Sequence, residues 1–196
     1  MIAGVILDGG RASRMGGGDK GLRRLAGQPL IAHVMGRLAP QVAALAISGR
    51  DGVAGFGLQV LADSVAGQPG PLAGVLAAMD WAAGLGSAQV VTVAADTPFI
   101  PRDLVARLAA AGDVAVAASA DGADGVRVHP VCALWPVRLR EGLRAALAAG
   151  ERRVGLWAAQ HGAVEVVFAA VPIDPFFNIN TPADLALAET LAAAAP

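Results

Sequence analysis

Residues 1–21 read MIAGVILDGGRASRMGGGDKG, and this stretch joins an apolar strand to a glycine-rich loop. Val5 to Leu7 closes the strand with apolar side chains, and the breaker cluster at residues 8–10 ends it. The loop that follows contains six glycines, with two arginines and one lysine between them. Such a loop, placed directly after a first strand, predicts an α/β fold with a ligand site at the end of that strand.

Alternating strand and helix signals continue along the rest of the chain. Strands are expected at 43–47, 59–61, 89–94, 114–118, 128–135 and 164–168, and helices at 29–38, 71–83, 101–111, 138–149 and after Thr181-Pro182. This alternation predicts a single α/β domain over residues 1–196, with a mainly parallel sheet in a three-layer αβα arrangement. Ligands of such sheets bind outside the C-terminal strand ends, so the loops at 8–20, 63–74 and 96–101 are candidates for the site.

The composition excludes several classes of partner. The formal net charge is −1, so no global basic field attracts nucleic acid or a membrane surface. The apolar content is 55%, but no uninterrupted apolar run is long enough for a transmembrane helix. The first residues lack a basic leader, and the lone Cys132 excludes an internal disulfide, so we expect a cytoplasmic protein.

The glycine-rich loop has the composition of a phosphate-binding site. Glycine lets consecutive backbone N–H groups approach a phosphate and form an anion-binding concavity. Arg14 can bind phosphate oxygens in a bidentate way, and Lys20, the only lysine beside fourteen arginines, supplies a compact charge. The loop has neither the Gly-Lys-Ser/Thr end of a Walker motif nor the Gly-x-Gly-x-x-Gly of dinucleotide-binding folds. We interpret it as a phosphate loop of another kind; a surface loop without a ligand is the alternative.

Residues 7–30, LDGGRASRMGGGDKGLRRLAGQPL, resemble the signature of nucleotidyltransferases with the glycosyltransferase-A-like fold. Within that group the chain is most similar to the molybdenum cofactor guanylyltransferases. Further matching motifs span residues 3–189 in the family's order: PGPLAG at 69–74, DTPF at 96–99, RVHP at 127–130, GERR at 150–153 and FNINTP at 177–182. The first motif alone indicates a nucleotidyltransferase, whereas the whole set indicates this family.

The resemblance implies a Rossmann-like fold and an enzyme that transfers GMP from GTP to the terminal phosphate of molybdenum-molybdopterin, with Mg²⁺ as cofactor. It implies GTP binding in about residues 1–100 and molybdopterin binding in about residues 101–190. Transient contact with proteins that supply molybdopterin or accept the cofactor is also expected. Two alternatives stay open. One is a molybdopterin cytidylyltransferase or sugar-phosphate nucleotidyltransferase, and the other is a non-catalytic nucleotide- or cofactor-binding protein.

The nucleotide side of the expected site lies at the strand ends. Asp96 follows a buried strand, so its carboxylate could hold Mg²⁺ at the sheet edge, with a turn-capping role before Pro98 as the alternative. The resemblance implies that Asp96, Arg14 and Lys20 are catalytic. It also implies a nucleotide-contacting set: Leu7, Asp8, Gly9, Gly10, Gly17, Lys20, Ser48, Asp63, Gly74 and Asp96. For Asp63, just past the strand at 59–61, a turn role is the alternative.

Two members of this set depart from the family's pattern. Asp8 stands where relatives usually have a small residue. It could repel phosphates, accept hydrogen bonds from guanine or point away from the ligand. Ser48 stands where relatives tend to have asparagine, which weakens any contact assigned to it.

The second substrate has its own candidates. Asn178 and Asn180 are the only asparagines, and their spacing in an extended segment lets both side chains point to one side, toward a pterin edge. Arg152 or its neighbour Arg153 could bind the pterin's phosphate, with a solvated basic helix start as the alternative. His129 is a molybdopterin-binding candidate or else a structural histidine.

Overall fold

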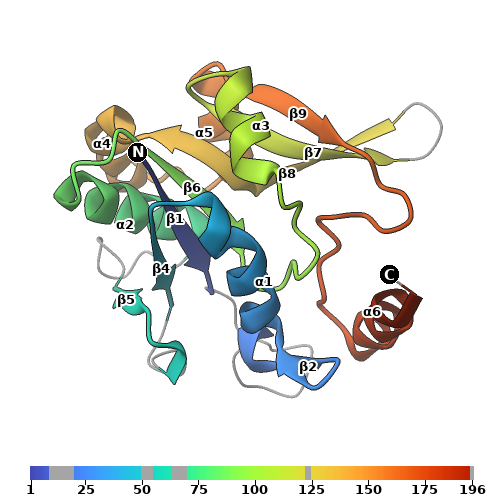
Figure 1. The fold of residues 1–196 in the computed structure, drawn as a ribbon. Helices are drawn as coiled ribbons and strands as arrows, with labels where there is room; N and C mark the ends of the chain where they lie inside the picture. Colours follow the sequence, from blue (N-terminus) through green and yellow to red (C-terminus); the bar gives the residue numbers. More distant parts are fainter. Residues whose placement is uncertain (9–19, 50–54, 63–69, 122–124, 195–196) are drawn as a thin grey trace.

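The computed structural model describes residues 1–8, 20–49, 55–62, 70–121 and 125–194 (Figure 1). Their strands are β1 (Ile2–Leu7), β2 (Arg24–Leu25), β3 (Gln28–Pro29), β4 (Ala44–Ser48), β5 (Gln59–Leu61), β6 (Gln89–Ala94), β7 (Ala115–Asp121), β8 (Gly125–Pro136) and β9 (Val164–Phe168). The α-helices are α1 (Leu30–Leu38), α2 (Pro71–Gly84), α3 (Leu104–Ala111), α4 (Arg140–Ala148), α5 (Val154–Gln160) and α6 (Pro182–Ala194). Short 3₁₀ turns are η1 (Lys20–Leu22), η2 (Ala39–Gln41) and η4 (Val137–Leu139).

Seven strands form one sheet in the order β5-β4-β1-β6-β8-β7-β9. β8 runs antiparallel to β6 and β7, and the other neighbouring strands pair in parallel. The predicted mainly parallel sheet is therefore confirmed. Parallel strands bury both faces, which explains the near-continuous apolar runs in β1 and β6.

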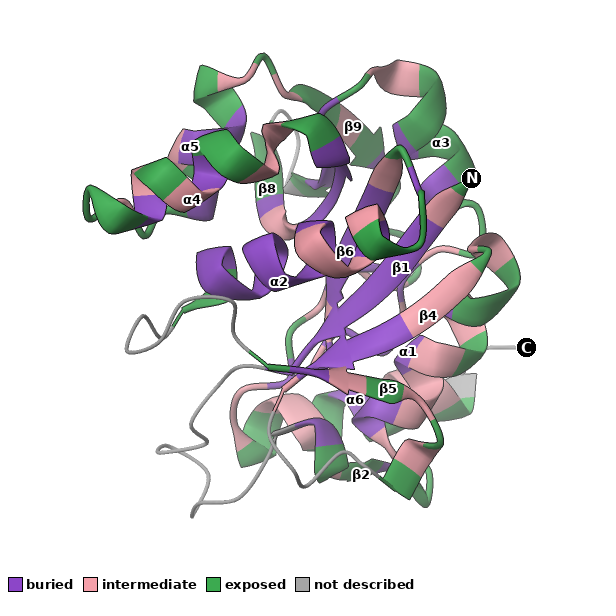
Figure 2. Cartoon of the chain, turned by 90° about the vertical axis from the view of Figure 1, so that its left-hand side faces the viewer, coloured by how far each residue is buried: buried purple, intermediate pink, exposed green. Residues whose placement is uncertain are grey.

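Helices cover the sheet on both sides, as predicted. Alternate residues of β1 face opposite layers: Ala3, Val5 and Leu7 pack in the cluster under α2, α4 and α5, whereas Ile6 packs in the cluster under α1 and α3. Helix α2 is buried along most of its length (Figure 2). Apart from Asp80 it is apolar all round, because the sheet covers one side and α4 packs on it. Asp80 Oδ1 lies 2.7 Å from Arg144 Nη2 of α4.

A third, smaller cluster joins β2 and the start of α1 to residue 179 and helix α6. Helix α6 packs beside β2, and the cluster contains Leu25, Leu30, Ile179 and Ala188. β2 and β3 form a hairpin whose turn has φ of 47° at Ala26 and 79° at Gly27, as a two-residue primed turn requires. Glu189 Oε1 accepts the Ala26 N–H at 2.9 Å. The C-terminal helix therefore holds the β2–β3 hairpin, which follows the glycine-rich loop in sequence, in place.

Some element boundaries differ from the sequence-based expectation. Helix α3 begins at Leu104 rather than 101, because the preceding turn is fixed by Gln41, which donates to the Pro101 carbonyl and accepts the Val105 N–H. β8 begins at Gly125 rather than 128 because it extends alongside β7 as far as Asp121. Helix α5 and the β2–β3 hairpin were not predicted, and both are short. Within the described part of the chain, no helix combines the length and apolarity needed to cross a membrane.

Candidate active site

The C-terminal ends of β1, β4 and β6 meet at one edge of the sheet. Leu7 lies opposite both Ser48 and Ala94 in the strand register. Just beyond these pairs the Asp8 N–H donates to the Ser48 carbonyl at 2.7 Å, and the Ala95 N–H donates to the Leu7 carbonyl at 3.0 Å. Three of the predicted nucleotide-contacting positions, at Leu7, Asp8 and Ser48, are thus brought together beside the turn that carries Asp96.

Gly74 lies in α2 against this edge. A Cβ on Gly74 would stand 3.2 Å from Leu7 Cδ2 and 3.3 Å from Ser48 Oγ, so only glycine lets the helix approach so closely without displacing these side chains. Leu7 and Ser48 are both buried. The predicted positions Leu7, Ser48 and Gly74 therefore form one packed group behind the edge.

Asp8 is buried under the chain that returns from the glycine-rich loop. It is 8% exposed, and a Cβ on Gly21 would stand 3.0 Å from its Oδ1 and 3.3 Å from the Ala95 Cβ. Gly21 follows Lys20 in η1, so the backbone of Lys20 lies one residue from this contact. The three possible roles of Asp8 stay predictions. Gly9, Gly10, Arg14, Gly17, Asp63 and the Lys20 side chain lie outside the described part.

Asp96 lies beside the predicted second-substrate segment. The Ile179 N–H donates to the Asp96 carbonyl at 3.0 Å. Ile179 is 1% exposed in the third cluster, whereas Asn178 is exposed and Asn180 is half-buried. The predicted projection of both asparagine side chains to one side, toward a pterin edge, stays a prediction. The structure thus brings two distant motifs of the sequence together, 96–99 and 177–182.

The end of this segment is fixed by the start of α6. Thr181 Oγ1 accepts the Asp184 N–H at 3.1 Å, which confirms the predicted helix cap. Asp184 Oδ2 in turn accepts the N–H groups of Asn180 and Thr181 at 2.9 and 2.8 Å. Burial alone would raise the pKa of Asp184, but these hydrogen bonds outweigh it and lower the pKa. Asn180 is therefore held at its backbone.

His129 is buried in a short polar chain. Its Nε2 lies 2.8 Å from Ser119 Oγ, which lies 3.2 Å from Asp174 Oδ2. Burial lowers the pKa of His129 although the nearby Asp174 opposes the shift, so the ring is neutral at pH 7. Its predicted contact with molybdopterin stays a prediction. Sequence reasoning missed Ser119 and Asp174, because each stands alone among apolar residues without a motif.

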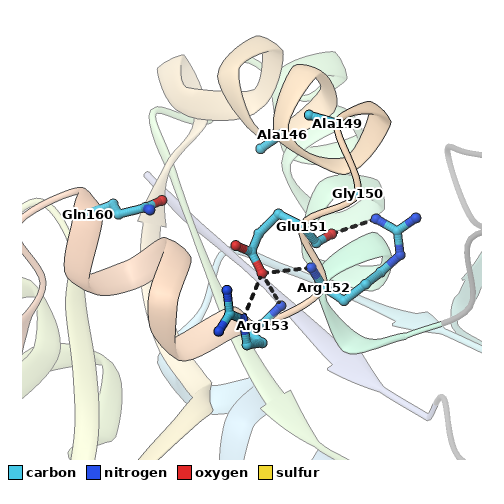
Figure 3. A pocket seen from close by; sticks show the side chains of 7 residues that line it. All are labelled: Ala146, Ala149, Gly150, Glu151, Arg152, Arg153 and Gln160. Atoms are coloured by element: carbon cyan, nitrogen blue, oxygen red, sulfur yellow. Dashed lines mark hydrogen bonds and ion pairs between the residues drawn. The ribbon is translucent and has the colours of Figure 1, made fainter.

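Arg152 lies in the layer of α4 and α5, beside a cavity of about 580 Å³. Its Nη1 donates to the carbonyls of Leu147 and Glu151 at 2.8 and 2.6 Å, and so binds the C-terminal end of α4. Figure 3 shows the side chains around this cavity, which is lined by Ala146, Ala149, Gly150, Glu151, Arg152, Arg153 and Gln160. The α5 start contacts β8 next to His129, since a Cβ on Gly155 would stand 3.3 Å from Pro130 Cγ. The predicted contact of Arg152 with the pterin's phosphate stays a prediction.

Glu151 organises the two arginines and was not predicted. Its Oε1 accepts the N–H groups of Arg152 and Arg153 at 2.8 Å each, and lies 3.3 Å from Arg153 Nε. These hydrogen bonds, with the backbone N–H of Arg153 first, lower the pKa of Glu151 to about 2. The carboxylate thus occupies a small anion-binding concavity at the start of α5.

The depressed pKa of Glu151 predicts a pH-dependent stability. A carboxylate whose pKa is lower in the folded state stabilises the fold fully above its unfolded pKa, and this contribution is lost as pH falls through the folded value. Glu151→Gln should therefore lower the melting temperature at pH 7, and the difference from the unmodified protein should shrink between about pH 4.5 and pH 2. Thermal unfolding at pH 7, 4 and 2.5 measures this. An equal difference at all three pH values would contradict the assignment.

The sheet order, the glycine-rich stretch after β1 and the carboxylate after β6 define a nucleotidyltransferase of the glycosyltransferase-A-like class. Residues 4–164 match the MobA-like NTP transferase domain, and the chain belongs to this family. The resemblance noted in the sequence is thereby confirmed.

Known relatives resemble the chain over almost its full length. It is 50% identical to a molybdenum cofactor guanylyltransferase of Bradyrhizobium sp. (strain ORS 278), covering 98% of this chain and 93% of the relative. It is 49% identical to one of Cereibacter sphaeroides, covering 97% and 96%. Among solved structures, molybdopterin-guanine dinucleotide biosynthesis protein A from Archaeoglobus fulgidus has a TM-score of 0.72 at 24% identity, covering 98% of this chain and 99% of that one. That last similarity shows the fold.

Proposed function

We propose that this protein transfers GMP from GTP to the terminal phosphate of molybdenum-molybdopterin, giving the guanine dinucleotide form of the cofactor and pyrophosphate. The identity of about half to molybdenum cofactor guanylyltransferases supports the substrates. The geometric observation that carries the proposal is the hydrogen bond from the Ile179 N–H to the Asp96 carbonyl. It joins the residue whose carboxylate would hold Mg²⁺ on the nucleotide's phosphates to the segment that carries two asparagines suited to a pterin.

The two substrates are proposed to bind in different halves of the chain. GTP would bind to about residues 1–100 at the ends of β1, β4 and β6, where the proposed contacts are Leu7, Asp8, Gly9, Gly10, Gly17, Lys20, Ser48, Asp63, Gly74 and Asp96. Molybdopterin would bind to about residues 101–190, with Asn178 and Asn180 at the pterin and Arg152 at the phosphate. His129 on β8 is also proposed to bind molybdopterin.

The residues at the edge fit a Mg²⁺ ion that is shared with the substrate. Among the described residues no group of three or more His, Cys, Asp or Glu side chains could form a protein cage for a metal. Mg²⁺ is typically held by one or two carboxylates together with phosphate oxygens and water. Asp96, half-buried at the sheet edge, is the proposed protein ligand. When bound, the ion would supply charge that neutralises the phosphates.

The chain's own contribution is alignment and charge. An oxygen of the acceptor's terminal phosphate attacks the α-phosphorus of GTP, a P–O bond forms, the bond to the β-phosphate oxygen breaks, and pyrophosphate leaves. The acceptor phosphate is already ionised near pH 7, so no general base is required. Arg14 and Lys20 would neutralise charge on the transferred and leaving phosphates, and the loop amides would orient them.

We further propose that the protein works in the cytoplasm and meets its partners only briefly. The single cysteine leaves no partner for an internal disulfide, which supports a reducing compartment. The proposed partners are proteins that supply molybdopterin or accept the finished cofactor.

Product analysis tests the proposed function. We expect incubation with molybdopterin, Mg²⁺ and GTP to give a product heavier than molybdopterin by one GMP unit, with one pyrophosphate released per product. CTP, ATP and UTP, each supplied alone, should give at least tenfold less product. Equal or better use of CTP would identify a cytidylyltransferase instead. GTP binding without pyrophosphate release at any molybdopterin concentration would identify a non-catalytic binding protein.

A further inference from the structure

Hydrogen bonds among buried polar side chains connect β7 and β8 to the start of the second-substrate segment (residues 177–182). Ser119 on β7 is fully buried and His129 on β8 is 9% exposed. Ala117 lies opposite His129 in the register, so Ser119, two residues further along, is its diagonal neighbour on the same face. Asp174 follows β9 and is the third member of this hydrogen-bonded group, with its Oδ2 3.2 Å from Ser119 Oγ.

The donors in this hydrogen-bonded group can be assigned from chemistry. An ionised carboxylate only accepts hydrogen bonds, so the single Ser119 hydroxyl proton is donated to Asp174 Oδ2. The serine oxygen must then accept a proton from His129 Nε2 across 2.8 Å. The neutral His129 ring therefore carries its proton on Nε2, with the lone pair on Nδ1.

The same carboxylate holds the beginning of the second-substrate segment. Asp174 Oδ1 accepts the Phe176 N–H at 2.9 Å, and its carbonyl accepts the Phe177 N–H at 3.0 Å. The Phe176 ring is 1% exposed, with its centroid 4.8 Å from that of His129. Three residues after Phe176, Ile179 makes the hydrogen bond to Asp96.

We propose that Asp174 is a positioning residue for the second substrate. It fixes the proton of His129 through Ser119, and it sets the course of the segment that presents Asn178 and Asn180. The inference rests on the proposed function for the identity of that substrate, but the hydrogen-bond assignment does not.

Asp174→Asn is a nearly isosteric change that reverses the donor and acceptor roles in the hydrogen bonds between residue 174, Ser119 and His129. The asparagine side-chain oxygen can still accept the hydrogen bond from the Phe176 N–H. The asparagine NH₂ group then faces Ser119. That group donates, so the serine hydroxyl must donate to His129 Nε2, and the histidine proton moves to Nδ1. A residue with a merely structural role would not change the histidine tautomer.

The chain has three histidines, which makes the tautomer directly measurable by ¹⁵N NMR of histidine-labelled protein at pH 7.5. His33 Nε2 lies 2.8 Å from the Leu25 carbonyl and His161 Nδ1 lies 2.8 Å from the Trp157 carbonyl, so they serve as internal references for the two tautomers. We expect His129 to carry its proton on Nε2 in the unmodified protein and on Nδ1 in Asp174→Asn. His129→Gln assigns its signal.

Kinetics provides the second readout. For Asp174→Asn we expect the KM for molybdopterin to rise about tenfold, as is typical when a group that orients a ligand-contacting residue is changed. The kcat and the KM for GTP should stay within about twofold of the values of the unmodified protein. Asp113→Asn, which removes an exposed carboxylate paired with Arg138, is the matched control and should change neither readout. If Asp174→Asn fails to fold, Ser119→Ala replaces it. That variant should abolish the single tautomer of His129 and raise the same KM.

The outcomes separate the inference from the proposed function. A His129 proton that stays on Nε2 in Asp174→Asn, or an unchanged KM for molybdopterin, would overturn the positioning role. Absence of product from the unmodified protein would overturn the proposed function. The NMR result, which needs no substrate, would still decide whether Asp174 controls His129.

Discussion

Replacing Asp96 with asparagine is expected to lower kcat roughly 10²–10³-fold, the range seen when one preorganised charge-stabilising group is removed from an active site. Asp96 follows β6, and its carbonyl accepts the Ile179 N–H, at the place where we propose that the two substrates meet. Asparagine keeps that backbone bond but lacks the negative charge that a divalent cation requires. Steady-state pyrophosphate release with molybdopterin and GTP measures the effect.

Two further measurements make the Asp96 result specific. Titration with Mn²⁺, followed by electron paramagnetic resonance in the presence of GTP, should show at least tenfold weaker metal binding in Asp96→Asn. The thermal midpoint should stay within a few degrees of the unmodified protein, because the hydrogen bond to Ile179 is retained. Turnover within threefold of the unmodified protein, at saturating metal, would remove Asp96 from the catalytic set.

The layers of the fold could be predicted from the sequence because they depend on local patterns of apolar residues. The apolar run Gln89–Ala94 and the regular alternation of strands and helices predict a sheet covered on both faces, and β6 has those bounds. The position of β8 in the sheet could not be predicted in this way. β8 pairs antiparallel between β6 and β7, a long-range choice that no local pattern of residues 128–135 expresses.

The candidate site divides along a similar line. The position of Asp8 and Asp96 at one edge of the sheet could be predicted, because both residues directly follow strands and parallel strands end at a common edge. The hydrogen bonds of Ser119, Asp174 and Glu151 could not be predicted, because they depend on how the folded elements pack. The bond between Ser119 and Asp174 joins residues 55 positions apart. The closeness of Ile179 to Asp96 likewise depends on α6 and the third cluster.

Replacing Lys20 with alanine is expected to lower turnover roughly 10²–10³-fold, because a positive charge held at the transferred phosphates stabilises the transition state more than the ground state. Lys20 begins η1, and the next residue, Gly21, packs against the Asp8 carboxylate and Ala95 at the ends of β1 and β6. The lysine backbone is therefore anchored at the edge where we propose that the phosphates bind. With the chain's fourteen other cationic side chains all arginine, the compact ammonium group stands out as a chemical choice.

Lys20→Arg separates charge from shape. It keeps the positive charge but spreads it over a planar group with a different set of donors, so we expect it to recover only part of the turnover lost in Lys20→Ala. The KM for molybdopterin should change less than twofold in both variants, because the second substrate is proposed to contact the other half of the chain. Near-normal pyrophosphate release by Lys20→Ala would exclude the catalytic role. Full recovery by Lys20→Arg would instead indicate that charge alone, and not the ammonium geometry, is what the site requires.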